Sequence, residues 1–192
     1  LVGSEMCIRD RFTKKAEQMK NVDNSGIKDT VHIAKLTAGS LKTPSGEAKV
    51  IGVVEGELLT TDCGSASGIN VKKDILKLCV AERHHATGHV GVYYVKGYKL
   101  KEGAVATSIA HDSHNIIAVG ASDDDILLAI RTIERMHGGM AVVNNGRVLA
   151  ELELPVAGLM CELDVSKAQL SLIHISEPKT CADLVCRLLL EK

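Results

Sequence analysis

The sequence has very few aromatic residues, with one phenylalanine, three tyrosines and no tryptophan among 192 residues. Its core must therefore be aliphatic, and the length is sufficient for one domain with a sizeable core. Strong charge of either sign is also lacking, because the formal net charge is −1. This balance gives no electrostatic basis for binding nucleic acid or a membrane surface. No apolar run approaches the roughly 18 residues of a membrane span.

A zinc-binding cysteine pattern is missing as well. The six cysteines show no zinc spacing, and Cys181 and Cys186 are five residues apart instead of three. Free thiols in a reducing compartment explain this usage most simply, so the sequence predicts a cytoplasmic protein.

Both ends of the chain differ from the middle. One stretch of DNA can encode residues 172–178 on one strand and residues 3–8 on the opposite strand, one frame over. The two ends resemble a transposase sequencing adapter translated as protein, so residues 1–11 and 170–192 are expected to be foreign, like a fusion scar. The tail from residue 179 is of unknown origin. Residues 12–169 are expected to be the evolved domain, with a polar linker to about residue 28.

The most informative stretch is residues 103–120, GAVATSIAHDSHNIIAVG. Two apolar runs of strand length bracket a polar segment, which predicts two buried strands joined by a turn. The turn carries His111, Asp112, Ser113, His114 and Asn115. Such side chains are costly to bury without partners, and scaffolds often present functional groups in loops of this kind. A plain polar turn, in which Asp and Asn bond their own backbone, is the alternative.

A second polar cluster follows the predicted strand at 74–81. It contains Glu82, Arg83, His84, His85 and His89. These residues could join the first cluster at one end of a sheet. The alternatives are a local Glu82–Arg83 ion pair and solvated loop histidines.

A helix over about 123–137 has the clearest local signals. Ser122 is a good N-cap, three aspartates follow it at the positive end of the helix dipole, and a glycine pair at 138–139 ends the helix. Apolar residues recur at helical spacing between these ends. After it, Asn145-Gly146 lies between two apolar runs and predicts a tight hairpin.

Further strands are expected at 31–36, 49–55, 57–61, 74–81 and 90–95, with a tight joint at Gly56 and a Gly/Ser loop at 63–70. Together these elements predict an α/β layered domain, with a mixed, largely antiparallel sheet of about six to eight strands and one main helix. The apolar segment 156–160 must be covered by this domain, another domain or a second subunit.

Several motifs carry a family resemblance. They are SIAHDSHNIIAVG, the following helix and glycine pair, VVNNGRVLAEL and LPVAGLM; the segments around AERHHATGHVGVYYV, VHIAKL and KVIGVVEGELLTTD fit the same pattern. Residues 26–164 thereby resemble the C-terminal domain of bacterial adenine deaminases. Departures are small: the family's glycine triplet is His137-Gly138-Gly139, its Leu-Pro-Leu-Pro is Leu152-Glu153-Leu154-Pro155, and Cys161 replaces a serine.

The resemblance implies hydrolytic deamination of adenine to hypoxanthine and ammonia. It also implies an amidohydrolase barrel that holds manganese or iron to activate water. This sequence has no His-x-His pair, and a (β/α)8 barrel needs roughly 250 residues. The chain is thus interpreted as a fragment, inactive alone, with no metal expected in it. The missing barrel and adenine are the expected partners, and a homo-oligomer is possible.

Three hypotheses remain open for the polar clusters. In the first, His111, Asp112, His114 and Asn115, joined by Glu82, Arg83 and His84, support the active site of the missing barrel. In the second, the chain is a non-catalytic interface or oligomerisation module that makes contact through residues 156–160. In the third, it is a small stand-alone metallohydrolase whose metal is bound by His111 and His114.

Overall fold

The structure is a computed structural model, and it describes residues 23–43, 46–54 and 59–163. Within these ranges the chain forms one α-helix, α2 (Asp123–Arg135), and eight strands. The strands are β1 (Ala48–Val53), β2 (Thr60–Ala66), β3 (Leu76–Ala81), β4 (Val90–Lys96), β5 (Ala104–Thr107), β6 (Ile116–Gly120), β7 (Gly139–Asn144) and β8 (Arg147–Glu153). Three short 3-10 turns are η1 (Ser25–Ile27), η2 (Ala38–Leu41) and η3 (Val71–Lys73).

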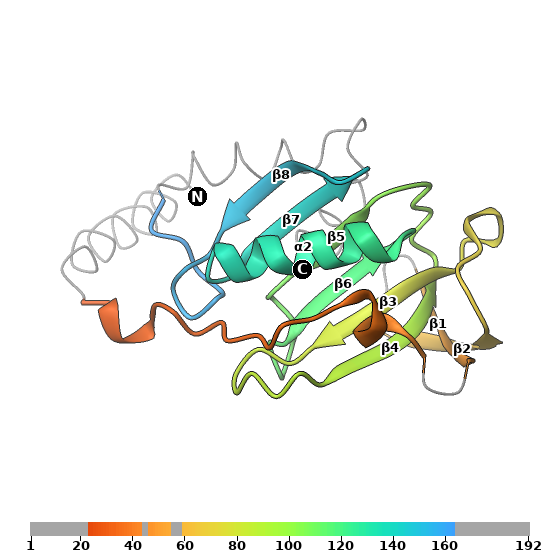
Figure 1. The fold of residues 1–192 in the computed structure, drawn as a ribbon, viewed down its shortest axis with the longest axis horizontal. Helices are drawn as coiled ribbons and strands as arrows, with labels where there is room; N and C mark the ends of the chain where they lie inside the picture. Colours follow the sequence, from red (N-terminus) through yellow and green to blue (C-terminus); the bar gives the residue numbers. More distant parts are fainter. Residues whose placement is uncertain (1–22, 44–45, 55–58, 164–192) are drawn as a thin grey trace, which may run out of the picture.

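The strands form one open sheet in the order β2-β1-β4-β3-β6-β5-β7-β8 (Figure 1). Only the β1–β4 pair is parallel, and the other neighbours are antiparallel. The predicted mixed, largely antiparallel sheet with one main helix is therefore confirmed. No helix among the described residues is long and apolar enough to cross a membrane.

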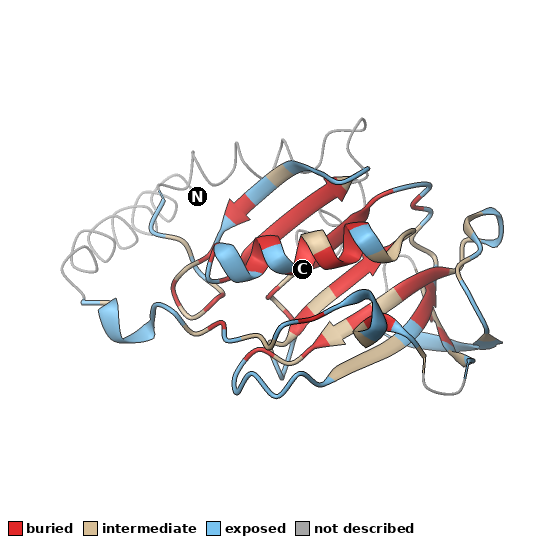
Figure 2. Ribbon diagram, viewed as in Figure 1, coloured by how far each residue is buried: buried red, intermediate tan, exposed pale blue. Residues whose placement is uncertain are grey.

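Helix α2 lies across one face of the sheet, over β5, β6 and β7 (Figure 1). Its buried side chains pack on small residues of the strands, among them Ala106, Ala118 and Ala141. Figure 2 shows that burial is concentrated on this helix face and on the central strands, whereas β2 is exposed. The aliphatic core that the scarcity of aromatic residues required is thus formed between one helix and one sheet face.

The local predictions around α2 are confirmed. The Ser122 hydroxyl accepts a hydrogen bond from the Asp125 backbone N–H and caps the helix. Asn144 pairs with Arg147 across a two-residue turn at Asn145 and Gly146. Their φ angles of 50° and 73° are those of the tight turn that Asn-Gly favours.

Two strand predictions need correction. The segment 31–36 is not a strand: the His32 N–H donates to Arg83 O at 2.7 Å, and His32 O accepts from the Ala86 N–H at 3.2 Å. It therefore pairs with a loop instead of the sheet. Val31 and Leu36 are buried at its two ends, and the burial between them does not alternate. The second strand of the first hairpin is Thr60–Ala66, so half of the predicted Gly/Ser loop is strand. An exposed edge strand needs no apolar pattern, which explains this error. The joint at Gly56 lies outside the described residues.

The face of β5, β7 and β8 that points away from α2 is also apolar. Val105, Met140, Val142 and Leu152 are buried there. Among the described residues no helix covers this face. The predicted foreign ends, residues 1–11 and 170–192, lie outside the described part of the chain. The same is true of residues 12–22, the first part of the expected linker.

Removing residues 1–11 and 170–192 tests the prediction that these ends are foreign. If they make no native contacts, the free energy of unfolding should change by less than about 0.5 kcal/mol, as for surface changes. Urea denaturation of the full and shortened chains measures this difference. A large loss of stability would show that the ends pack on the domain, and the apolar face of β5, β7 and β8 would be the first place to look.

Candidate functional site

The two polar clusters meet at one end of the sheet. Strands β3 and β6 are antiparallel neighbours whose last pair is Ala81 with Ile116. The loop 82–89 leaves β3 where the turn 108–115 enters β6, so the pairing brings the two segments together. The His84 ring nitrogen Nε2 lies 2.8 Å from Ser113 O and links them directly.

Arg83 is the structural centre of this region. Its side chain is almost completely enclosed, with 2% of its surface exposed. Nε donates to His114 O, Nη1 to Thr30 O and Oγ1 at 3.3 Å, and Nη2 to Ala157 O at 3.0 Å. One guanidinium thus joins three segments that are far apart in the sequence.

Arg83 has no acidic partner within the part of the chain that the structure describes. Burial alone lowers the pKa of its guanidinium. The alternative of a Glu82–Arg83 ion pair is therefore wrong. Backbone carbonyl dipoles replace a carboxylate as the partners of this cation, which makes Arg83 a clamp on the backbone.

Glu82 instead organises its own loop. Its carboxylate accepts hydrogen bonds from the N–H groups of His84, His85 (2.7 Å) and Thr87 (3.0 Å), and from the Thr87 hydroxyl at 2.9 Å. These donors, with the Thr87 N–H contributing most, lower the pKa of Glu82 from 4.5 to about 2. Glu82 is thus an ionised acceptor that shapes the loop.

The pKa of Glu82 predicts a pH dependence of the loop 82–89. A carboxyl whose pKa is depressed by folding stabilises the fold above its unfolded pKa of 4.5, and this contribution is lost as the pH falls toward 2. Amide exchange of His84, His85 and Thr87 should accelerate over that window relative to amides of the core. In the Glu82→Gln variant, the three amides should exchange faster at pH 7 than in the unmodified chain. Their protection should also no longer depend on pH between 4.5 and 2. Protection that is flat from pH 5 to pH 2 in the unmodified chain would contradict the assignment.

The 111–115 turn is partly exposed and partly held. His111 Nδ1 lies 2.6 Å from Asp112 Oδ1, and both side chains are largely exposed. His114 has a φ of 49° and donates its N–H to Ala110 O at 2.6 Å. Three buried side-chain polar atoms lack a hydrogen-bond partner among the described residues, and two of them are His114 Nδ1 and Asn115 Oδ1. Two of the three buried unsatisfied atoms among the described residues therefore lie at this turn.

The described residues contain no group of three or more His, Cys, Asp or Glu side chains arranged to hold a metal ion. His111 is exposed, whereas His114 Nδ1 is buried. Within the part of the chain that the structure describes, the side chains at the turn do not fit a metal, so no chemistry is assigned to a metal held by His111 and His114.

The sequence did not identify Ser108 and Gly158, which form the base of this region. The buried Ser108 hydroxyl donates to Gly158 O at 2.5 Å and accepts from the Gly139 N–H at 2.8 Å. A Cβ on Gly158 would lie 2.4 Å from Arg83 Nη1, so only glycine lets the guanidinium approach the backbone. No local pattern marks these contacts, because the partners come from separate segments.

The apolar segment 156–160 is consequently covered mainly by its own domain, although Met160 is 55% exposed.

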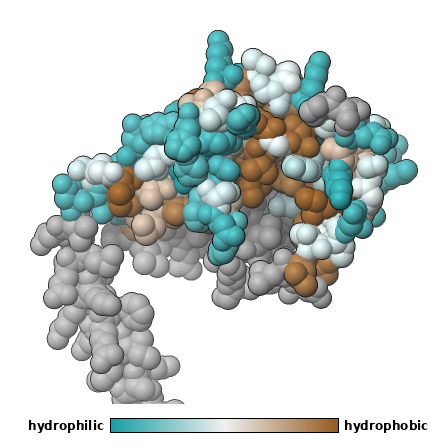
Figure 3. Space-filling model, turned by 90° about the horizontal axis from the view of Figure 1, so that it is seen from below, coloured by the Kyte–Doolittle hydropathy of each residue, from teal (hydrophilic) through white to brown (hydrophobic). Residues whose placement is uncertain are grey.

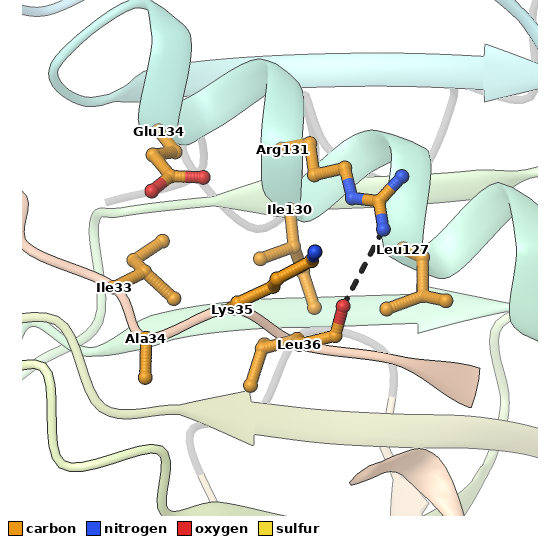
Figure 4. Close-up of a pocket in the computed structure, with 8 residues that line it drawn as sticks. All are labelled: Ile33, Ala34, Lys35, Leu36, Leu127, Ile130, Arg131 and Glu134. Atoms are coloured by element: carbon orange, nitrogen blue, oxygen red, sulfur yellow. Dashed lines mark hydrogen bonds between the residues drawn. The ribbon is translucent and has the colours of Figure 1, made fainter. Parts of the chain in front are cut away.

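The pocket in Figure 4 is a groove of about 420 Å³ between the segment 33–36 and α2. Ile33, Leu127 and Ile130 contribute apolar side chains, and Arg131 reaches across to donate to Leu36 O at 3.4 Å. The groove is the packing seam of the 31–36 segment on the helix. It is separate from the polar loops.

Comparison with known proteins gives a consistent result. Residues 54–188 match the family model described as the adenine deaminase C-terminal domain. The chain belongs to this family. It is 49% identical over 144 residues to an adenine deaminase of Nitratidesulfovibrio vulgaris (strain DP4), covering 71% of the chain and 25% of that protein. It is 42% identical over 163 residues to the adenine deaminase of Archaeoglobus fulgidus, covering 84% of the chain and 29% of that protein.

The chain therefore spans about a quarter of the length of these adenine deaminases. The resemblance seen in the motifs is confirmed at the level of the domain family. The matched range runs past residue 170 and overlaps the segment expected to be foreign; the deletion experiment tests that expectation.

Proposed function

We propose that this chain supplies the C-terminal part of an adenine deaminase, an enzyme that hydrolyses adenine to hypoxanthine and ammonia. In this proposal the segments 82–89 and 108–115 face an active site carried by a barrel that the chain does not contain. Membership of the adenine deaminase C-terminal domain family supports the assignment, as do relatives named adenine deaminase. The chain alone is expected to be inactive.

The pair of unsatisfied buried atoms at the turn carries the proposal. His114 Nδ1 and Asn115 Oδ1 each lack a partner among the described residues, and a buried polar group without one costs about 1–3 kcal/mol. Arg83 also holds the backbone of His114 in place, because its Nε donates a hydrogen bond to His114 O. A fold that holds unsatisfied polar atoms in fixed positions is suited to receiving polar groups from outside the domain.

Four side chains of the turn have defined roles in this proposal. The Asn115 oxygen accepts a hydrogen bond, and His114 Nδ1 donates or accepts one according to its tautomer. His111 Nδ1 lies 2.6 Å from Asp112 Oδ1, so the carboxylate can orient the exposed imidazole ring toward a partner. These groups position partners at the opening of the site. Manganese or iron, which would activate the attacking water, belongs to the barrel in this proposal.

An intact relative provides the direct test. Alanine at the positions equivalent to His114 and Asn115 should lower turnover of adenine by about 10–100-fold, if these groups act at the site. Oligomeric state and melting temperature should remain unchanged. The matched control, in a relative that carries histidine there, is alanine at the position of His137, an exposed histidine outside both segments whose ring lies 2.9 Å from Asp29; its turnover should change less than twofold.

Two other outcomes would reject the proposal. Loss of assembly with turnover spared would assign the turn to an interface. Stoichiometric metal in the dialysed chain, together with deamination of adenine by the chain alone, would establish a small stand-alone metallohydrolase.

One observation favours an additional interface function. Ile27, Met160 and Leu163 are exposed hydrophobic side chains. Their segments adjoin, because Ala157 N donates to Ile27 O at 2.7 Å and Lys28 pairs with Glu162 at 2.8 Å. This surface is a candidate contact for the barrel or for a second copy of the chain. Met160→Lys should weaken such an association in size-exclusion chromatography without altering the fold.

A further inference from the structure

A second site candidate lies away from the two polar loops, where α2 begins. It is a depression of about 550 Å³ between the strands β3 and β4, the segment after η2, and the segment after β2. Nine residues line it: Lys42, Thr43, Gly46, Ser67, Gly68, Ile69, Lys77, Tyr94 and Asp123. Its volume lies in the range usual for small-molecule sites.

Lys77 and Tyr94 form the buried floor of this depression. They are directly opposite each other in the antiparallel β3–β4 pair, so their side chains lie next to each other on one face. Both are enclosed, with exposed fractions of 8% and 3%. Lys77 Nζ donates to Leu41 O at 3.0 Å and to Asp123 Oδ1 at 2.5 Å.

The floor retains unused hydrogen-bond donors. An ammonium group has three N–H donors, and Lys77 uses two of them. The Tyr94 hydroxyl has no hydrogen-bond partner among the described residues, although the residue is 97% enclosed. This hydroxyl is not one of the fully buried unsatisfied atoms of the described residues, and Tyr94 lines an open depression, so the hydroxyl is available to a molecule bound there.

The rim adds further donors and a positive charge. Thr43 and Ser67 contribute hydroxyl groups, and Lys42 is an exposed cation without an ion pair in the described part of the chain. Asp123 is the one carboxylate in the lining and already pairs with Lys77. Asp125 points elsewhere, accepting from the Ser122 hydroxyl and from the Gly146 N–H. Two ammonium groups against one carboxylate leave a formal charge of about +1 for a ligand to neutralise.

We propose that this depression binds a phosphate group, held by the Lys77 ammonium, the Tyr94 hydroxyl and Lys42. Phosphate supplies several acceptor oxygens and negative charge, which match a donor-rich lining with surplus positive charge. The depression is larger than one phosphate, so a phosphate ester of a small sugar fits the available volume. Nothing in this inference depends on the proposed deaminase function, because the site lies on other elements.

The test is a titration of the full chain with inorganic phosphate and, separately, with ribose 5-phosphate. Binding is measured from the amide chemical shifts at constant ionic strength. Saturable shifts are expected at Thr43, Ser67, Lys77 and Tyr94, while the loops 82–89 and 108–115 remain unmoved. Tighter binding of the ester would identify a phosphorylated small molecule, whereas equal binding would identify the phosphate ion itself.

Two tyrosines provide a matched pair of variants. Tyr94→Phe removes one hydroxyl that makes no hydrogen bond among the described residues, so it should fold normally and bind phosphate about fivefold more weakly. Tyr93→Phe makes the same change one residue earlier on the same strand, on the opposite face, and should leave affinity unchanged. Lys42→Ala should also weaken binding. Absence of saturable shifts with both probes, or equal affinities of the two tyrosine variants, would overturn the proposal.

Discussion

Replacing Arg83 by methionine is expected to destabilise the domain by about 3 kcal/mol, and to lower its melting temperature by roughly 10 °C. The guanidinium satisfies carbonyl groups of three segments, at Thr30, His114 and Ala157. Methionine fills much of the same volume but donates no hydrogen bond. Each orphaned buried carbonyl costs about 1–3 kcal/mol, and the relief from burying a charge offsets part of the sum.

Two further substitutions make this measurement specific. Arg83→Lys keeps the charge but loses the planar fork, so it should recover less than half of the lost stability. Arg131→Met removes an arginine that makes one hydrogen bond, to Leu36 O at 3.4 Å, and should cost about 1 kcal/mol or less. Urea denaturation provides all three values. A cost below about 1 kcal/mol for Arg83→Met would mean that the clamp does not hold the three segments together.

Gly139→Ala is expected to cost about 4 kcal/mol or to prevent folding. Gly139 begins β7 with a φ of 143°, and a Cβ there would lie 2.0 Å from Leu152 O. The β7–β8 pair would have to separate to accommodate it. The same residue binds Ser108 through its N–H and its carbonyl, so the change would also shift the base of the 108–115 segment.

Gly146→Ala is the control for this steric effect. Gly146 also has a positive φ, 73°, but an added Cβ would meet no heavy atom within 4 Å. Its cost should be about 1 kcal/mol, from the left-handed backbone alone. The difference between the two variants in thermal or urea unfolding isolates the clash with Leu152. Equal stability of the two would show that the β7–β8 pair yields easily at this position.

Elements whose signals lie within a few neighbouring residues were predictable. Helix α2 begins after Ser122 because the cap, the acidic first turn and the apolar stripe are all local. The β7–β8 hairpin turns at Asn145-Gly146 for the same reason. The segment 31–36 has an alternating sequence that predicted a strand, but no sequence signal revealed that it would pair with the loop 82–89 instead of the sheet.

The candidate site shows the same division. The two polar clusters were identifiable from residue types, and their proximity was an inference from neighbouring strands; the β3–β6 pairing accounts for it. The role of Glu82 was not foreseen, because a carboxylate that binds its own loop looks identical in sequence to one that pairs with Arg83.

The sequence by itself determined the helix, the hairpin, the aliphatic core and the residue types of the 111–115 turn, because each depends on residues close together in the chain. Only the tertiary structure decided that Arg83 fixes this turn, since its partners lie at positions 30, 114 and 157. Likewise, the unsatisfied atoms of His114 and Asn115 emerge only when the whole domain has packed around them. Burial and hydrogen-bond satisfaction are properties of the folded chain, and for that reason the functional hypothesis required the structure.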